Sequence, residues 1–592
     1  MMKSLGKPCG FVPANGVSHR HCQLHILWTF GKSSAGCSLS CYSSSPGAHI
    51  PSTQERLRML EIWSNTHVTP EELSGSGSIR GGKWTVDASG RDPSAGLVIN
   101  VSGISVGAGL ASACDTLISQ TFGSRNLKRI GVILQRGIII LMIFCFPCWA
   151  LFINTEHILL AVHQSPEVAK LSQLYVWIFI PGLPAAFLYQ LEIRYLQNQG
   201  ITLPQVFTGL IANVFNAVVN YLLLYVLTLG VLGSAAANVA SQYFQVILLF
   251  LYIRWKKLHV RTWTGWSADC LQEWGNFVRL AIPSMLMLCI EWWTYEVGTF
   301  LAGLVSEVEL GAQSVIYQVL TAAYMIPLGC SVAASVLVGN ALGARNPEKA
   351  QNSAAIALCF IGCCSLLIST TLGAARSVLG YVFTSDKEII QLVSDVDPVI
   401  ATFHWFEAIA TVSGGVLRGA GKQKLGAIGN LVGFYSIGFP LGIALMFAAH
   451  LGVIGLWSGF FICVVVQAAF FLVVIYKMNW RKASEQAMIN AGMKVNVDTS
   501  YSSCNGQVND IPTDARTENI AVIVLSNLNP VESNVDTEQL REETSAPEIG
   551  VTIVGEILST KQLILRRGLA LLSGPVILGI GLVVQLTVAK GT

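Results

Sequence analysis

The sequence predicts an all-α polytopic membrane protein with two pseudo-symmetric lobes of helices and one additional C-terminal helix. Three observations lead to this fold class: a low charge content, long apolar runs and an internal repeat. The 592 residues are 52% hydrophobic and only 12% charged, which is about half the charged fraction of an ordinary soluble domain. The mean hydropathy is +0.55. A helical membrane protein is the only broad class that fits this composition.

About twelve segments reach the length of roughly 20 apolar residues that a helix needs to cross a bilayer core. They are 95–119, 133–153, 172–191, 204–226, 231–253, 277–303, 311–335, 354–376, 396–417, 424–447, 452–476 and 567–588. These runs lack the ten-residue alternation of an outer-membrane barrel, so we expect helices and no spanning strands.

Lysine and arginine follow every second predicted span. The basic loops are 125–129, 254–261, 345–349, 418–424 and 477–482. Because positively charged loops stay in the cytoplasm, we expect these loops on the cytoplasmic side. The segment before residue 95 is then expected outside. Arg566 and Arg567 mark the inner end of the last span, which also places the C-terminus outside.

An internal repeat organises the spans into two halves. SACDTLISQTFGSRN at 112–126 recurs in character as VAASVLVGNALGARN at 332–346, and both copies end in Gly-x-Arg-Asn. LGVLG at 229–233 recurs as LGVIG at 451–455. Two copies of one multi-span unit are a recurring transporter architecture, in which the binding site lies between the halves near the middle of the membrane.

The repeat leaves the first half one helix short. The span at 277–303 has its counterpart at 57–83, where the sequence LRMLEIWSNTHVTPEELSGSGSIRGGK is too polar to lie in lipid as a helix. Residues 1–94 are rich in Ser, Gly and Pro and are expected to be disordered. An alternative transcript or gene model that lost the first span is one explanation.

The spans and the repeat together give the expected domain organisation. It comprises a disordered N-terminal segment at 1–94, an N lobe of five spans at 95–253, an inter-lobe cytoplasmic loop at 254–276, a C lobe of six spans at 277–476, a disordered cytoplasmic linker at 477–566 and a C-terminal transmembrane helix at 567–588.

Two glutamates are the strongest candidates for functional residues. Glu291 and Glu407 each lie near the middle of a predicted span, where a charge is unfavourable by about 2.5–3.5 kcal/mol and marks a functional site by default. The alternative is a structural role as hydrogen-bond acceptors between helices. Glu296 lies about 140° around the helix from Glu291, so we expect the two not to share one site and favour Glu291 as the cavity residue. His404 precedes Glu407 by about one helical turn. It either packs there or tunes the protonation of Glu407 and relays protons to it.

Further candidates line the same predicted helices. Trp292 and Tyr295 follow Glu291, and their rings would attract an organic cation by cation–π contact, although packing is the plainer role. Asn213, Asn216 and Asn220 form a polar stripe on the span at 204–226. This stripe either lines a cavity of the N lobe or makes hydrogen bonds between helices.

Four segments carry a resemblance to a known family. SACDTLISQTFGSRNLKRIGVILQR at 112–136, LAIPSMLMLCIEWWTYEVGTF at 280–300, VELGAQSVIYQ at 308–318 and FEAIATVSGGVLRGAGKQKLGAI at 406–428 resemble the vertebrate multidrug and toxin extrusion (MATE) transporters. The resemblance covers residues 95 to about 490 and returns at 561–588. It implies two six-helix lobes that face a central cavity, an extra C-terminal helix, and antiport of organic cations against protons.

The resemblance also implies roles for individual residues. Glu291 and Glu296 fall on the first pair of membrane carboxylates of this family, and Glu407 falls on the later one. Gln318 stands where vertebrate members commonly have a further glutamate. Because an amide cannot bind and release a proton, either this position is dispensable or the coupling is altered.

The predicted function is therefore secondary active transport rather than catalysis. The expected partners are small organic cations and the lipid bilayer, with no nucleic acid, no metal and no cofactor beyond the coupling proton, and the expected location is the plasma membrane. A glutamate suits this exchange because it is anionic when it holds a cation and neutral when it carries a proton. The alternatives are another cargo or sodium coupling on the same fold, or an inactive truncated product that pairs with a full-length copy.

Overall fold

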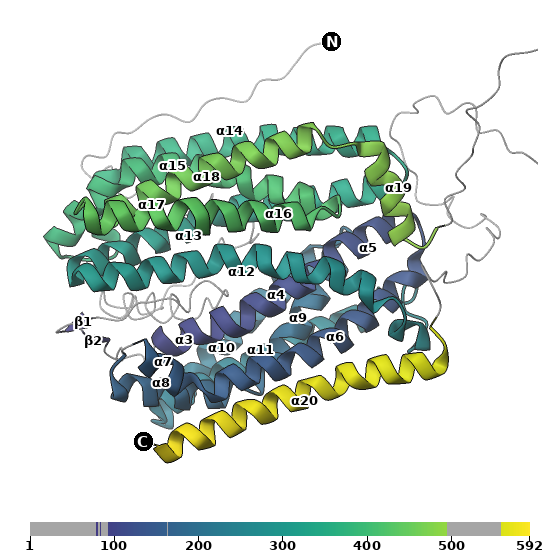
Figure 1. Ribbon diagram of the computed structural model, residues 1–592, viewed down its shortest axis with the longest axis horizontal. Helices are drawn as coiled ribbons and strands as arrows, with labels where there is room; N and C mark the ends of the chain where they lie inside the picture. Colours follow the sequence, from purple (N-terminus) through teal and green to yellow (C-terminus); the bar gives the residue numbers. More distant parts are fainter. Residues whose placement is uncertain (1–78, 81–82, 85–92, 163, 494–557, 592) are drawn as a thin grey trace, which may run out of the picture.

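The computed structural model describes residues 79–80, 83–84, 93–162, 164–493 and 558–591. Within these residues, 11 helices are long and apolar enough to cross a membrane, or up to 12 when a bent pair of helices counts as one span. Each of the predicted spans falls on one of them. The helices form two groups, one from each half of the sequence (Figure 1). The predicted fold class is therefore confirmed.

The N lobe starts with a span made of four consecutive pieces. They are α3 (Pro93–Ile99), the π-helical turn η1 (Asn100–Ile104), α4 (Ser105–Ala111) and α5 (Ala113–Gly123). The rest of the lobe consists of α6 (Leu127–Ile153), α7 (Thr155–Ala161), α8 (Pro166–Phe179), α9 (Gly182–Gln197), α10 (Leu203–Tyr221), the π-helical turn η2 (Leu222–Val226) and α11 (Gly230–Trp255). Helices α8 and α9 are bent by 57° relative to each other at the short break between them.

The C lobe contains longer continuous helices. After the short turn η3 (Ala268–Leu271), it consists of α12 (Trp274–Val305), α13 (Glu307–Gly343), α14 (Pro347–Leu379), η4 (Gly380–Val382), α15 (Lys387–Gly419), α16 (Gln423–Asn430), η5 (Leu431–Gly438), α17 (Phe439–Ile443), η6 (Ala444–Ala448) and α18 (Gly452–Tyr476). A surface helix, α19 (Trp480–Asn490), follows. The last helix, α20 (Thr560–Gly591), runs along the outer edge of the N lobe (Figure 1).

Local sequence signals explain where several C-lobe helices begin. Ser306 accepts a hydrogen bond from the backbone N–H of Glu309 at 3.1 Å, and Asn346 accepts one from Lys349 at 2.9 Å. Such side chains satisfy backbone donors that have no partner within the first turn of a helix. Helices α13 and α14 therefore begin at residues that suit a helix N-terminus.

The internal repeat extends to the backbone conformation of its turns. Arg125 and Arg345, the arginines of the two Gly-x-Arg-Asn motifs, have φ of 62° and 56°. Thr228 and His450, next to the second repeated motif, have φ of 50° and 54°. Positive φ is uncommon for residues other than glycine. Its occurrence at matching positions shows that the two halves share these turns as well as their sequence.

Part of the N-terminal segment and of the linker differs from expectation. Ile79–Arg80 (β1) and Lys83–Trp84 (β2) pair as a short antiparallel hairpin in a stretch that the repeat would assign to a membrane helix. Residues 1–78, 81–82, 85–92 and 494–557, on which the expectations of disorder mainly fall, lie outside the described residues.

The expectation of a disordered linker is wrong for its first residues, because α19 forms there. Asn479 caps this helix by accepting from the N–H of Lys482 at 3.0 Å. Its buried side includes Trp480, Ala483 and Ala487, while Arg481 and Lys482 are exposed. The polar composition concealed an amphipathic helix, whose apolar side packs on the protein.

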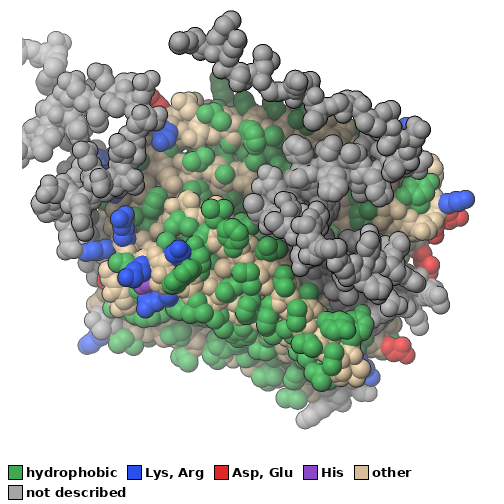
Figure 2. Space-filling view, turned by 180° about the vertical axis from the view of Figure 1, so that it is seen from behind, with side chains coloured by type: hydrophobic (Ala, Val, Ile, Leu, Met, Phe, Trp, Pro, Cys, Tyr) green, Lys and Arg blue, Asp and Glu red, His purple; other side chains and the backbone are tan. Residues whose placement is uncertain are grey.

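Charged side chains are distributed unevenly between the two ends of the molecule. Figure 2 shows lysine and arginine mainly at one end and several acidic side chains at the other, with an apolar band between them. The basic end includes Arg254, Lys256 and Lys257, all of which are exposed. This pattern follows the positive-inside rule, and we call this end the cytoplasmic end.

The two lobes contact each other closely at the cytoplasmic end, where α5 crosses α13. A Cβ atom at Gly343 would lie 2.0 Å from the carbonyl oxygen of Gln120, and one at Gly123 would lie 2.1 Å from that of Asn340. These two contacts are related by the internal repeat. Only glycine permits such an approach of two backbones, so the repeated motif forms the inter-lobe crossing itself.

Polar contacts reinforce this crossing. Thr116 donates from Oγ1 to the carbonyl oxygen of Arg418 at 2.6 Å, and Gln120 donates from Nε2 to that of Gly419 at 3.0 Å. Helix α19 adds a contact, because Asn490 Nδ2 donates to Gln120 Oε1 at 2.9 Å. In the described structure, the two lobes are therefore in direct contact on the cytoplasmic side.

Candidate functional site

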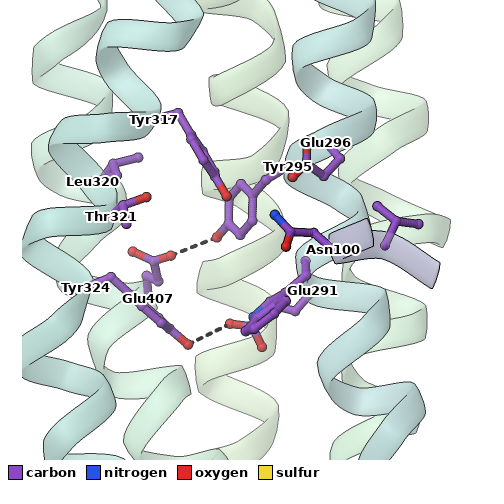
Figure 3. A pocket seen from close by; sticks show the side chains of 11 residues that line it. Asn100, Glu291, Tyr295, Glu296, Tyr317, Leu320, Thr321, Tyr324 and Glu407 are labelled. Carbon is purple, nitrogen blue, oxygen red and sulfur yellow. Dashed lines mark hydrogen bonds between the residues drawn. The ribbon is translucent and has the colours of Figure 1, made fainter. Parts of the chain in front are cut away.

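A pocket lies where three helices of the C lobe meet the beginning of the N lobe (Figure 3). Helix α12 supplies four of its lining residues, α13 four, α15 one, and the turn η1 two. The residues are Glu291, Trp292, Tyr295, Glu296, Tyr317, Leu320, Thr321, Tyr324, Glu407, Asn100 and Val101. The pocket therefore contains all three carboxylates that the sequence predicted as functional.

Tyrosine hydroxyls hold two of these carboxylates. Tyr295 donates from Oη to Oε1 of Glu407 at 2.7 Å, and Tyr324 donates from Oη to Oε1 of Glu291 at 3.1 Å. Figure 3 shows these two bonds one above the other in the pocket. Two ionised carboxylates that share one pocket repel each other. Neutral donors therefore orient both acids without supplying a compensating positive charge.

No lysine or arginine of the described chain forms an ion pair with a carboxylate of the pocket. The one charged-type contact is from His404, whose Nδ1 lies 3.5 Å from Oε2 of Glu407. His404 is fully enclosed and is absent from the pocket lining. It therefore lies behind Glu407, on the side away from the pocket.

Aromatic rings form much of the remaining wall. Trp292, Tyr295, Tyr317 and Tyr324 all line the pocket. The rings of Tyr295 and Tyr317 lie 6.0 Å apart and are tilted by 50°, which leaves ring surface on two sides of the space. Ring faces attract cations, most strongly where water is excluded. Carboxylates and aromatic faces in one pocket form a site suited to an organic cation.

The placement of the acids differs from expectation in one respect. Glu291 and Glu296 were expected not to share a site, yet both line this pocket. The reason is that the pocket follows the side of α12, where Trp292 and Tyr295 connect the two acids. Glu296 is 9% exposed, and Figure 3 places it beyond Tyr295 from Glu291.

Two other predicted residues lie elsewhere. Gln318 is exposed and is absent from the pocket lining, and Asn213 lies on α10 of the N lobe, also outside the lining. The neighbouring Asn216 donates from Nδ2 to Asn238 Oδ1 at 3.0 Å and to Ser241 Oγ at 2.9 Å. Asn216, one residue of the polar stripe on α10, therefore makes hydrogen bonds between helices.

Several lining residues were not anticipated. Tyr317, Thr321 and Tyr324 follow each other at helical spacing on α13, and this polar and aromatic stripe within an apolar span was a usable signal. Asn100 is one of several polar residues in the first span, and nothing in the local sequence distinguishes it from the others. It comes into the pocket through the packing of η1 against α12, which no local pattern indicates.

The sequence is similar to proteins of one family along most of its length. The MatE family model matches residues 94–222 and 283–444. Multidrug and toxin extrusion protein 1 of Danio rerio is 57% identical over 490 residues, which are 82% of this chain and 82% of that protein. Multidrug and toxin extrusion protein 1 of Homo sapiens is 54% identical over 82% of this chain and 85% of its own. The chain belongs to the multidrug and toxin extrusion family.

Solved structures agree with the MATE fold. The eukaryotic MATE transporter AtDTX14 aligns with a TM-score of 0.67 and 29% identity, over 73% of this chain and 96% of its own. The Vibrio cholerae MATE transporter VcmN aligns with a TM-score of 0.61 over 72% of this chain and 95% of its own, and at 15% identity it supports the fold alone. The chain is thus an integral, multi-pass membrane protein of a transporter family, and its relatives are transporters rather than enzymes.

Proposed function

We propose that this MATE protein exports organic cations in exchange for protons. The observation that carries the proposal is the pocket itself. It brings Glu291 and Glu407 together beside aromatic rings, and each carboxylate accepts a hydrogen bond from a tyrosine hydroxyl. No lysine or arginine of the described residues forms an ion pair with either one, and the imidazole of His404 lies 3.5 Å from Glu407. A carboxylate inside a membrane protein without a permanent counter-ion is available to a transported cation or a proton.

Repulsion between the two acids supplies the basis for exchange. Two nearby carboxylates disfavour joint ionisation, so the site gains stability from either a cation or a proton. A cation bound against both acids and the rings of Trp292 and Tyr295 neutralises the repulsion. A proton on one acid removes the same repulsion and weakens the hold on the cation. Cation and proton therefore compete for one site, which is the requirement for antiport.

The cytoplasmic crossing of α5 and α13 supports alternating access. The pocket is separated from the cytoplasm by close contacts at Gly123 and Gly343 and by hydrogen bonds such as Thr116 to Arg418. We propose that these contacts break when the site opens inward, so that loading and release take place on opposite sides. Export from a cell requires residence in the plasma membrane. The coupling ion is the proton, and no cofactor is required.

The test is transport by the purified full chain in liposomes. Uptake of radiolabelled tetraethylammonium is measured under an imposed pH gradient, under an imposed sodium gradient, and with neither. We expect uptake with the pH gradient alone, and loss of that uptake in Glu407→Gln and Glu291→Gln. Glu348→Gln is the matched control, because Glu348 is an exposed acid at the start of α14. Uptake driven only by sodium, or no uptake of cations at all, would overturn the proposal.

A further inference from the structure

Asn100 is the one polar side chain that the N lobe contributes to the lining of the pocket. Apart from Val101, every other lining residue comes from α12, α13 or α15 of the C lobe. Asn100 is the first residue of the π-helical turn η1. Single π-helical turns inside α-helices are frequent at functional sites. The turn therefore places one amide opposite the acids of the other lobe.

The position of this turn is fixed by contacts with α12. Trp293 donates from Nε1 to the carbonyl oxygen of Val101 at 2.9 Å, and Cys289 Sγ lies 3.6 Å from Ser105 Oγ. The first contact joins the turn itself, and the second joins the start of α4, to the helix that carries Glu291 and Glu296. Asn100 is thus held in place at the boundary between the two lobes.

The amide of Asn100 has an unused acceptor. The residue is only 4% exposed, and its Oδ1 has no hydrogen-bond partner among the described residues. Figure 3 shows the amide directed into the pocket between Tyr295 and Glu291. Nearly all buried polar groups in native proteins are hydrogen-bonded. An oriented acceptor that lacks a donor, beside a site for cations, suggests that the ligand provides the donor.

We propose that Asn100 accepts a hydrogen bond from an N–H group of the transported cation and thereby favours protonated amines and guanidinium compounds over quaternary ammonium compounds. The inference rests on the proposed function and names its substrate class. Carboxylates and rings attract either type of cation by charge. A neutral acceptor distinguishes them, because a quaternary ammonium ion has no N–H to donate.

The test compares two cations in one transporter. Uptake of phenylguanidinium and of tetraethylammonium is measured in liposomes, and the readout is the ratio of their kcat/KM values. Expression level and overall charge of the site cancel in this ratio. We expect Asn100→Leu, which keeps the volume and removes the acceptor, to lower the ratio about tenfold through a higher KM for phenylguanidinium, as the loss of one hydrogen bond to a charged donor predicts.

Matched variants separate this role from packing. Asn100→Asp keeps an acceptor and should keep the ratio, while its added charge acts on both cations. Ser102→Ala changes the same turn at a side chain that bonds to its own helix, at Val98, and Tyr324→Phe removes the donor to Glu291. Neither of these should change the ratio. Asn100→Ala replaces Asn100→Leu if the latter is absent from the membrane.

The outcomes are distinguishable. A lower ratio in Asn100→Leu together with an unchanged ratio in Asn100→Asp supports the inference. An unchanged ratio in Asn100→Leu, or equal losses for both cations, overturns it. A shifted pH dependence at an unchanged ratio also overturns it and shows that Asn100 accepts from a protonated carboxyl group instead. Failure of the unaltered chain to transport either cation would instead contradict the proposed function.

Discussion

Two groups of buried carboxylates in this protein have opposite surroundings. Glu291 and Glu407 in the pocket accept hydrogen bonds from tyrosines. Glu273, before α12, lies 2.7 Å from Arg129 and 3.3 Å from Arg136 in an almost fully enclosed cluster. Among the described residues, the first group has no lysine or arginine partner and only the imidazole of His404, 3.5 Å from Glu407, whereas Glu273 has two arginine partners.

A second arginine-paired acid lies in α5 of the N lobe. Asp115 is 3.1 Å from Arg194 and accepts from Asn198 Nδ2 at 3.2 Å. An acid that is paired with arginine already has a cationic partner within the protein. Its contacts hold helices together, and its charge is already compensated. The comparison teaches that a carboxylate buried among membrane helices can serve the structure alone where an arginine pairs with it.

The largest expected effect is that of Glu407→Gln. The amide keeps the size of the side chain and can still accept from Tyr295, but it carries no charge and binds no proton. We expect pH-driven exchange of tetraethylammonium to fall to background while the protein remains in the membrane. Liposome uptake together with size-exclusion chromatography checks both parts. If the variant keeps most of its transport at a normal folded yield, Glu407 is not required for exchange, and the contrast between the pocket acids and the arginine-paired acids fails.

Glu273→Gln should act on stability instead. Removing one partner of a buried ion pair leaves the others uncompensated and destabilises a protein by about 3–5 kcal/mol. Here Arg129 and Arg136 both lose their negatively charged partner. We expect a lower melting temperature in detergent and a lower folded yield, with the pH dependence of transport by the surviving protein unchanged. A normal melting temperature combined with altered coupling would place Glu273 in the transport site.

Gly343→Val tests the crossing that separates the pocket from the cytoplasm. The added side chain meets the backbone of Gln120, and overpacking of this kind is unfavourable by about 1–3 kcal/mol. We expect the contact between α5 and α13 to be weakened. A cysteine in place of Ser119, which packs against Gly339 in the crossing, would then react faster with a thiol reagent. Gly329→Val on the same helix is the control, since a Cβ there meets no atom within 4 Å. Equal labelling in both variants would show that the crossing does not move.

Much of the fold followed from sequence because long apolar runs have few alternatives in a bilayer. The twelve spans, the repeat and the acids Glu291 and Glu407 were all visible in the chain. Helix α19 was missed because a polar composition masks a helix that packs through a few residues such as Trp480 and Ala483. Asn100 was missed because a π-helical turn and its packing on α12 depend on residues far apart in the sequence.

Tyr295→Phe addresses the hydroxyls that hold the pocket acids. Tyr295 donates to Glu407 at 2.7 Å, and a hydrogen bond to a charged group contributes about 1.5–3 kcal/mol. Without it the ionised acid is less well stabilised, so protons compete better with the cation. We expect cation uptake to be inhibited at higher pH than in the unaltered chain. Tyr324→Phe, with a longer bond of 3.1 Å to Glu291, should produce a smaller change in the same direction. An opposite shift would contradict this assignment.

The smallest expected effect is that of Gln318→Glu. The resemblance places an acid at this position, and a fourth carboxylate in the site would strengthen cation binding. In the structure, however, Gln318 is exposed and absent from the pocket lining, while its neighbour Tyr317 faces the pocket. A charge outside the lining acts through a solvent-like medium, where exposed pairs contribute about 0–1 kcal/mol. We therefore expect tetraethylammonium affinity to rise by less than about fivefold, which corresponds to that energy, and the pH profile to remain in place. A larger rise in affinity together with a shifted pH profile would show that position 318 enters the site when the lobes rearrange. The pocket of that variant would then contain four acids.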